Sequence, residues 1–136
     1  MRKLITYSVP ALAAVAVAAL SCVQLASARV DRPAASKTVQ VKGGEFFFRL
    51  STKSLSKPGK VTFVFKNIGH VQHDFKMCRA PGKAPVNACS GTHTPLIRPG
   101  KTARLAVTFK KKGKYAFLCT VPGHAQAGMK GLFTVR

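Results

Sequence analysis

Short runs in which every second residue is large and apolar recur along this 136-residue chain. The alternation is clearest over residues 61–65 and 105–109. Side chains of a β-strand point alternately to opposite faces, so this period indicates strands with one buried face. Glycine and proline residues, typical of turns, stand between the runs. The pattern predicts seven strands, at Lys37–Lys42, Glu45–Leu50, Lys60–Lys66, Val71–Met77, Thr102–Phe109, Lys114–Cys119 and Lys130–Val135.

Seven short strands without a helix of ordinary length predict an all-β domain. We expect a two-sheet Greek-key β-sandwich, because strands with one apolar face bury it by packing sheet against sheet. The length of the chain suits one such domain and does not require a second. Residues 78–94 contain two prolines and show no periodicity, so an irregular excursion is expected there.

The first 28 residues differ from the rest of the chain. Arg2 and Lys3 precede an uncharged apolar stretch that ends in Ala26-Ser27-Ala28, a pattern of small residues typical of signal-peptide cleavage. We therefore expect residues 1–28 to be a signal peptide and residues 29–136 to form the domain. An uncleaved anchor is the alternative, because such a stretch could span a bilayer core of about 30 Å. Either way the domain is expected to be exported, as a periplasmic or extracellular protein or one held at the membrane.

Three residues with soft or borderline metal-binding side chains, Cys119, His124 and Met129, lie within eleven residues near the C-terminus. A thiolate, an imidazole and a thioether together suit copper better than a hard cation. Two histidines and one cysteine in a trigonal set, with a weak axial methionine, form the blue-copper arrangement. The loop lacks one of these histidines, which must come from an earlier strand.

His73 is the candidate for the missing ligand. In the predicted strand Val71–Met77 the odd-numbered residues share one face, so His73 is expected to point into the apolar interior. The same period places Cys119 on the inward face at the end of its strand. A lone inward histidine or cysteine is usually a packing residue. It is the combination with the loop that favours a metal site.

These residues resemble the cupredoxin family, the group of plastocyanin, azurin and auracyanin. The resemblance covers most of the domain. It rests on Asn67-Ile68-Gly69 leading to His73-Asp74, on the Pro99-Gly100 turn, and on Gly113-Lys114-Tyr115 leading into Cys119. The ligand loop has four residues on each side of His124, and this spacing looks like the azurin type of loop. It implies one copper ion bound by ring nitrogens of His73 and His124, by the Cys119 thiolate and, more weakly, by the Met129 thioether.

One position departs from the family pattern. Many cupredoxins carry Asn after the first histidine, where its side chain ties that strand to the ligand loop, whereas this chain carries Asp74. A carboxylate can still accept a hydrogen bond from a backbone N–H near Thr120, although it cannot donate one. Its carboxylate adds a negative charge near the metal, so the reduction potential of the family does not carry over to this chain.

Four protein ligands leave no position for a substrate, whereas catalytic metal sites normally keep one free. We therefore do not expect an enzyme. The resemblance implies a type-1, or blue, copper protein that carries single electrons by Cu(I)/Cu(II) cycling between a redox protein donor and acceptor. A copper chaperone or storage protein with the same ligands remains the alternative.

Cys78 and Cys89 flank the irregular segment. A disulfide is the default for two such cysteines in an exported protein. The alternative is a second metal site that they would form with His93. Apart from that alternative, we expect His70 and His93 to be surface residues.

The chain carries 23 Lys and Arg against 3 Asp and Glu, and removal of Arg2 and Lys3 with the leader would lower its formal net charge from +20 to +18. Such a domain attracts anions, so acidic redox partners and an anionic membrane or wall surface are expected. Export and the dispersed basic residues argue against nucleic acid. The alternative interpretation is that the cationic surface only maintains solubility. We expect the protein to be a monomer.

Two surfaces follow from the predicted strands. Small apolar residues around His124 predict a patch where a partner docks briefly: Val121, Pro122, Ala125 and Ala127. The run Lys110–Lys112 precedes the strand that ends at Cys119, and at about 3.3 Å per residue it is expected roughly 20 Å from the metal. It could hold the protein to an anionic surface while the copper end stays free.

Overall fold

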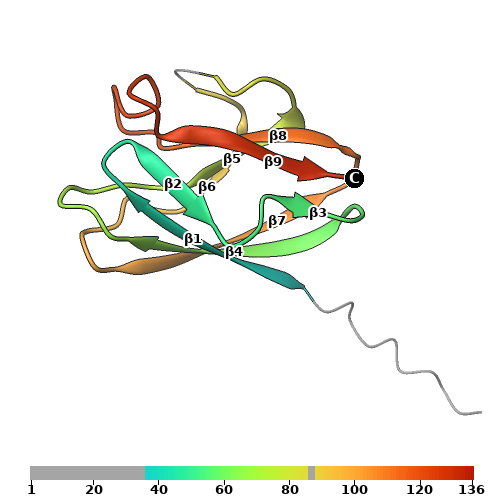
Figure 1. Ribbon diagram of the computed structural model, residues 1–136, viewed down its shortest axis with the longest axis horizontal. Helices are drawn as coiled ribbons and strands as arrows, with labels where there is room; N and C mark the ends of the chain where they lie inside the picture. The colour runs from blue at the N-terminus through green and yellow to red at the C-terminus, as the bar shows by residue number, and fades with distance from the viewer. Residues whose placement is uncertain (1–35, 86–87) are drawn as a thin grey trace, which may run out of the picture. The chain divides into compact units, whose positions relative to one another are not determined.

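The computed structural model describes residues 36–85 and 88–136, which form nine strands (Figure 1). The predicted signal peptide, with its cleavage point, lies outside the described residues. No helix in the described part of the chain is long and apolar enough to cross a membrane. The strands are β1 (Lys37–Gly44), β2 (Phe47–Leu50), β3 (Ser54–Leu55), β4 (Gly59–Asn67), β5 (Lys76–Pro81), β6 (Gly91–His93), β7 (Thr102–Phe109), β8 (Gly113–Leu118) and β9 (Lys130–Val135).

The strands form two sheets that face each other in Figure 1. One has the order β2-β1-β4-β7 and the other the order β3-β9-β8-β5-β6. Most neighbours are antiparallel, but β1 runs parallel to β4 and β3 parallel to β9. The chain therefore crosses between the sheets, and the prediction of an all-β, two-sheet sandwich is confirmed.

The core lies between the sheets and follows the alternating pattern of the sequence. Val61, Phe63 and Phe65 of β4 are each 0% exposed, and Phe63 is paired in register with Leu105 of β7. Side chains at every second position thus meet on one face, and their burial is the main source of stability. The residues of this core are Val39, Val41, Leu55, Val61, Phe63, Phe65, Phe75, Met77, Ile97, Leu105, Phe109, Tyr115, Phe117, Phe133 and Val135.

Most predicted strands match within one or two residues, and two differences bear on the site. The second strand begins at Phe47 rather than Glu45, because Glu45 and Phe46 form a two-residue turn between the paired residues Gly44 and Phe47. Phe46 adopts a positive φ of 66° there. The predicted strand Val71–Met77 is mostly absent, because β5 begins only at Lys76.

Side chains, rather than a sheet ladder, bond backbone groups of His70 and Val71. The Asn67 amide donates hydrogen bonds to the carbonyl oxygens of Val71 and Ile97, each at 2.8 Å. His73 forms a single isolated bridge with Ile97, through which this segment is joined to the rest of the sandwich. His73 is therefore held in a loop that is pinned from several sides.

Residues 78–81 and 91–93, predicted as part of an irregular excursion, belong to strands. β5 extends to Pro81, and residues 91–93 return as β6, which pairs with residues 76–78 of β5. Cys78 and Cys89 form a disulfide, as expected. Since each sulfur is bonded to the other, the alternative of a second metal site with His93 is wrong.

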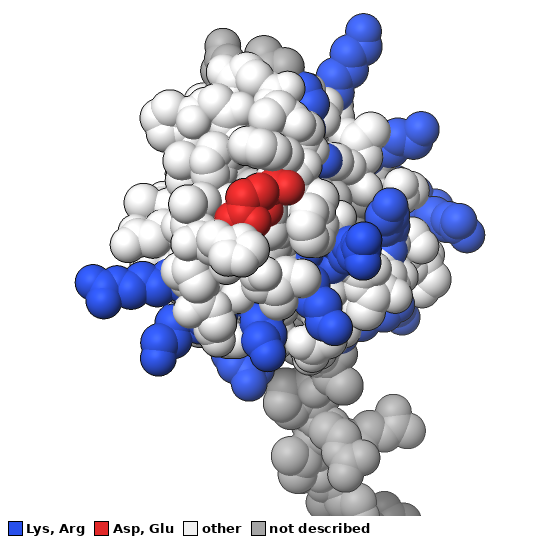
Figure 2. All heavy atoms as spheres, turned by 60° about the vertical axis from the view of Figure 1, so that its left-hand side comes forward, with Lys and Arg blue, Asp and Glu red and all other residues white. Residues whose placement is uncertain are grey.

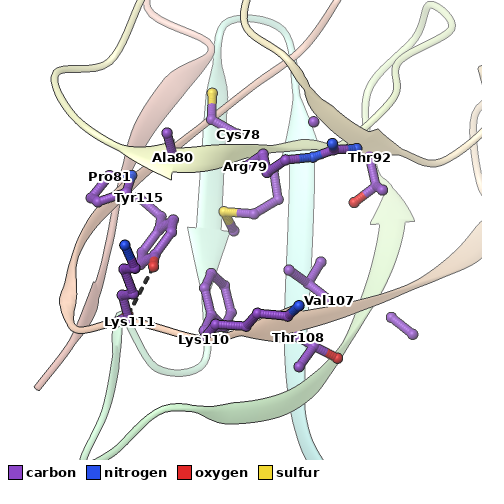
Figure 3. Close-up of a pocket in the computed structure, with 14 residues that line it drawn as sticks. Cys78, Arg79, Ala80, Pro81, Thr92, Val107, Thr108, Lys110, Lys111 and Tyr115 are labelled. Atoms are coloured by element: carbon purple, nitrogen blue, oxygen red, sulfur yellow. Dashed lines mark hydrogen bonds between the residues drawn. The ribbon is translucent and has the colours of Figure 1, made fainter.

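The lysine run lies at the end of β8 opposite Cys119, between β7 and β8. The Tyr115 hydroxyl donates a hydrogen bond to the Lys111 carbonyl at 2.8 Å, which fixes the run against the sandwich (Figure 3). Lys110 and Lys111 also line a surface cavity of about 540 Å³, together with Met77 and Phe109. This basic end and the end that bears Cys119 are thus separate surfaces.

Candidate metal centre

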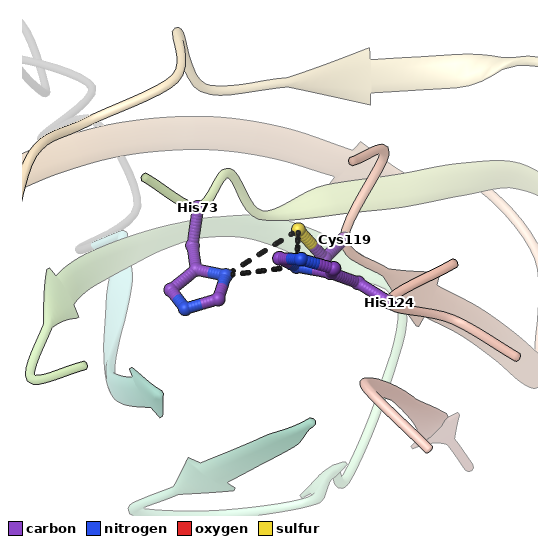
Figure 4. Close-up of side chains that lie close together, drawn as sticks. All are labelled: His73, Cys119 and His124. Carbon is purple, nitrogen blue, oxygen red and sulfur yellow. Dashed lines mark hydrogen bonds between the residues drawn. The ribbon is translucent and has the colours of Figure 1, made fainter. Parts of the chain in front are cut away.

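Three predicted ligands converge at one end of the sandwich although they come from different segments (Figure 4). His73 lies in the β4–β5 connection, Cys119 directly follows β8, and His124 lies in the β8–β9 loop. The two Nδ1 atoms are 3.1 Å apart, and the Cys119 Sγ lies 3.8 Å from that of His73 and 3.6 Å from that of His124. His73 and Cys119 are buried and His124 is half-buried.

The spacing of these three atoms fits a transition metal. A point equidistant from them lies about 2 Å from each, close to the roughly 2.0–2.3 Å bonds that imidazole nitrogen and thiolate sulfur make to such an ion. Two imidazoles and a thiolate in a trigonal set are also the donors that blue-copper sites use. Both the geometry and the chemistry of the donor set therefore suit copper.

Burial sets the protonation of the donors in the metal-free protein. Loss of solvent raises the pKa of the Cys119 thiol to about 11. Desolvation also lowers the pKa of His73, although the Glu45 carboxylate opposes this effect. At neutral pH the metal-free protein therefore presents a thiol at Cys119 and a neutral imidazole at His73, and metal binding must release the thiol proton.

Met129 closes the ligand loop. It is 0% exposed, and its backbone N–H donates to the carbonyl of His124 at 2.9 Å while its carbonyl accepts from the N–H of Cys119 at 3.0 Å. The tight turns that allow this need φ values of 82° at Gly123 and 115° at Gly128. Three of the four predicted ligands are thus tied together by the backbone of one loop.

Asp74 links the two halves of the site. Its Oδ1 accepts a hydrogen bond from the Thr120 backbone N–H at 2.6 Å, and its Oδ2 accepts one from the Thr120 hydroxyl at 2.7 Å. The expected tie between the first histidine's segment and the ligand loop is therefore confirmed. The predicted strand faces had placed Asp74 away from the interior, yet it is 1% exposed, because this segment is not a regular strand.

Two neighbouring residues at the site had no signal in the sequence. The Glu45 Oε1 lies 3.5 Å from the His73 Nε2, and the Phe46 ring packs edge-on against the His124 ring at 5.6 Å between centroids. Hydrogen bonds from the backbone N–H groups of His70, of Glu45 itself and of Val71 lower the pKa of Glu45 to about 2. Each residue of the β1–β2 turn thus contacts one of the two histidines.

Comparisons with known proteins agree with the fold and the donor set. The family model of copper-binding proteins of the plastocyanin/azurin family matches residues 35–136. A protein of Pseudomonas aeruginosa named copper-resistant cuproprotein CopI is 28% identical, with 75% of this chain and 77% of that protein covered. Auracyanin-B of Chloroflexus aurantiacus is 26% identical, with 74% of this chain and 52% of that protein covered.

Solved structures show the same similarity. The reduced auracyanin of Roseiflexus castenholzii superposes with a TM-score of 0.60 at 25% identity, covering 74% of this chain and 98% of the other. A structure of auracyanin B gives the same TM-score at 27% identity, with 74% and 88% covered. Together with the family match over three quarters of the chain, these findings show that the chain belongs to the plastocyanin/azurin family of copper-binding proteins, the cupredoxins.

Proposed function

We propose that this protein is an exported one-electron carrier that holds a single copper ion through His73, Cys119, His124 and Met129. The convergence of two imidazole nitrogens and one sulfur carries the proposal. Both nitrogens are Nδ1, and Met129 would supply its thioether as the weak axial ligand. Bound copper supplies a Cu(I)/Cu(II) couple that accepts and returns one electron. Four protein ligands leave no place for a substrate, so we do not propose an enzyme.

The rigidity of the site supports electron transfer. The loop hydrogen bonds of Cys119, His124 and Met129, together with the Asp74–Thr120 pair, hold the donors close together. A site that the protein itself holds in place leaves little room for rearrangement when the charge of the ion changes. Little rearrangement accompanying the electron is what a carrier needs.

The surface above the site suits brief docking of a redox protein. Four of the five exposed large apolar side chains of the described residues belong to segments that bear or contact the site: Phe46, Ile68, Val71 and Leu96. Figure 2 faces this end and shows it largely free of charge, with Lys and Arg mostly at its margin. Of the apolar residues predicted around His124, Ala125 is buried, whereas Phe46, whose ring packs against that of His124, is exposed.

The basic margin favours acidic donor and acceptor proteins, steered by the net positive charge. The Cys78–Cys89 disulfide supports an oxidising location such as the periplasm or the extracellular space. The lysine run at the opposite end could hold the protein at an anionic surface without covering His124. A monomer suffices for this role, because the donors come from one chain.

A second function is favoured by the similarity to a copper-resistant cuproprotein. Under that hypothesis the same donors would bind copper for sequestration or delivery rather than for electron transfer. The two functions make opposite demands, because a carrier retains its ion while a delivery protein releases it.

Stopped-flow mixing distinguishes the two functions. Reduced copper-loaded protein is mixed with a small oxidant in one arm and with a moderate Cu(I) chelator in the other. We expect fast oxidation, with the intense thiolate-to-copper absorption appearing, and little copper loss over the same period. Cys119→Ser is the control that should lack the absorption. Rapid copper loss with slow oxidation would favour the second function, and absorption that persists in Cys119→Ser would overturn the ligand assignment.

A further inference from the structure

The outer nitrogen of His73 lies in an unusual environment. Its Nδ1 faces the other donors, while its Nε2 is buried and has no hydrogen-bond partner among the described residues. A histidine that binds a metal through Nδ1 in its neutral form must carry its proton on Nε2. A buried N–H without an acceptor is costly, so a nearby acceptor is required when the metal is bound.

Glu45 is the nearby acceptor. Its Oε1 lies 3.5 Å from the His73 Nε2, an ion-pair distance that a small shift would shorten to a hydrogen bond. The same oxygen accepts the backbone N–H groups of His70 at 2.6 Å and Val71 at 3.1 Å. The carboxylate is thus anchored on the loop that carries His73, and is not a freely moving surface group.

Charge around the site makes Glu45 distinctive. Among the described residues the only other side-chain carboxylate is that of Asp74, which is buried and bonded to Thr120. Figure 2 shows an acidic patch bordered by uncharged side chains, with Lys and Arg lying further out on the same face. Since the Asp74 side chain is buried, Glu45 supplies the acidic charge exposed on this face.

We propose that Glu45 is a positioning residue of the copper centre: its carboxylate accepts the Nε2–H of His73, fixes the ring with Nδ1 toward the metal, and favours Cu(II) over Cu(I). The inference rests on the proposed ligand set. A carboxylate behind a metal-binding histidine orients the ring and increases its basicity. A fixed negative charge on the far side of the imidazole ring from the ion also stabilises the state with the higher positive charge.

Glu45→Gln tests the charge with little change of shape. The amide oxygen can still accept the N–H groups of His70 and Val71, but the negative charge is lost. Gln40→Lys is the matched control, because it raises the net charge by the same one unit from an exposed position on β1. In Glu45→Gln we expect the ratio of Cu(II) to Cu(I) affinity to fall about tenfold, which equals a rise of about 59 mV in the reduction potential.

The control should shift the potential by less than a third of that amount, because solvent and salt screen a distant exposed charge. Equal shifts in both variants, or no shift in Glu45→Gln, would overturn the inference. A crystal structure of the copper-loaded wild-type protein provides a second measurement that needs no variant. We expect the distance from His73 Nε2 to the Glu45 carboxylate to contract to about 3.2 Å or less, and a longer separation would contradict the hydrogen bond.

The outcome can be separated from that of the proposed function. Copper-loaded wild-type protein without the thiolate absorption would overturn the proposed ligand set. A normal absorption in the wild type and in Glu45→Gln, with an unchanged potential, would overturn the role of Glu45 alone.

Discussion

The Asp74 carboxylate joins the segments that carry His73 and Cys119, so its removal should weaken the domain. It accepts hydrogen bonds of 2.6 and 2.7 Å from the backbone N–H and hydroxyl of Thr120. Hydrogen bonds to a charged group contribute roughly 1.5–3 kcal/mol each. The Thr120 side chain is exposed, so its released donors reach water, and the lower value applies. We expect Asp74→Ala to lower the free energy of unfolding of the metal-free protein by about 3 kcal/mol.

Asp74→Asn is the matched control. Its amide oxygen can accept the Thr120 N–H, and its NH₂ group can donate to the Thr120 hydroxyl oxygen. Two neutral hydrogen bonds then replace two charge-assisted ones, and we expect a loss of only about 1 kcal/mol, since neutral bonds contribute roughly 0.5–1.5 kcal/mol each.

Urea unfolding of the metal-free protein with its disulfide intact measures both losses. Thermal unfolding is an independent check, because 1 kcal/mol shifts the Tm of a domain of about 100 residues by roughly 4–8 °C. An Asp74→Ala variant within about 0.5 kcal/mol of the wild type would refute the reasoning, since that is the range of an ordinary surface substitution.

Three further predictions concern the metal and the disulfide. The Cys119 thiol has a pKa of about 11 and copper binds the thiolate, so the apparent Cu(I) affinity should rise about tenfold per pH unit between pH 7 and 9. A competition titration with a Cu(I) chelator measures this affinity, and an affinity that does not change with pH would contradict the prediction. Met129→Leu should keep copper and colour but raise the reduction potential, since a weaker axial donor stabilises Cu(II) less; complete loss of copper would make Met129 a structural ligand. Replacing Cys78 and Cys89 by Ala should lower the free energy of unfolding by about 3 kcal/mol, because the disulfide closes a loop with a sequence separation of 11 residues. Urea unfolding measures this loss, and an unchanged midpoint would contradict it.

Local patterns in the sequence were enough for the longer strands of both sheets and for most of the site, but not for the short strands β3 and β6. The period of two in residues 61–65 and 105–109 predicts buried faces, because strand geometry forces alternate side chains to one side. Cys119, His124 and Met129 lie in one loop held by its own backbone hydrogen bonds, so their spacing in the sequence encodes their spacing in space. His73 was also identified, although the strand assigned to it is wrong.

Contacts between distant segments were decided only by the tertiary structure. β1 runs parallel to β4 with Gly43 beside Asn67, and this register brings the β1–β2 turn next to the loop that holds His73. Glu45 can therefore reach residues 25 and more positions away, a proximity that no local period records. The same contacts replace the predicted strand at Val71–Met77, because side chains of Asn67 and Glu45 bind backbone groups that a sheet ladder would otherwise use. Side-chain hydrogen bonds of this kind depend on the pairing of whole strands, which is why the sequence alone predicted the donors and the Asp74 tie but not the contacts of Glu45 and Phe46 with the two histidines.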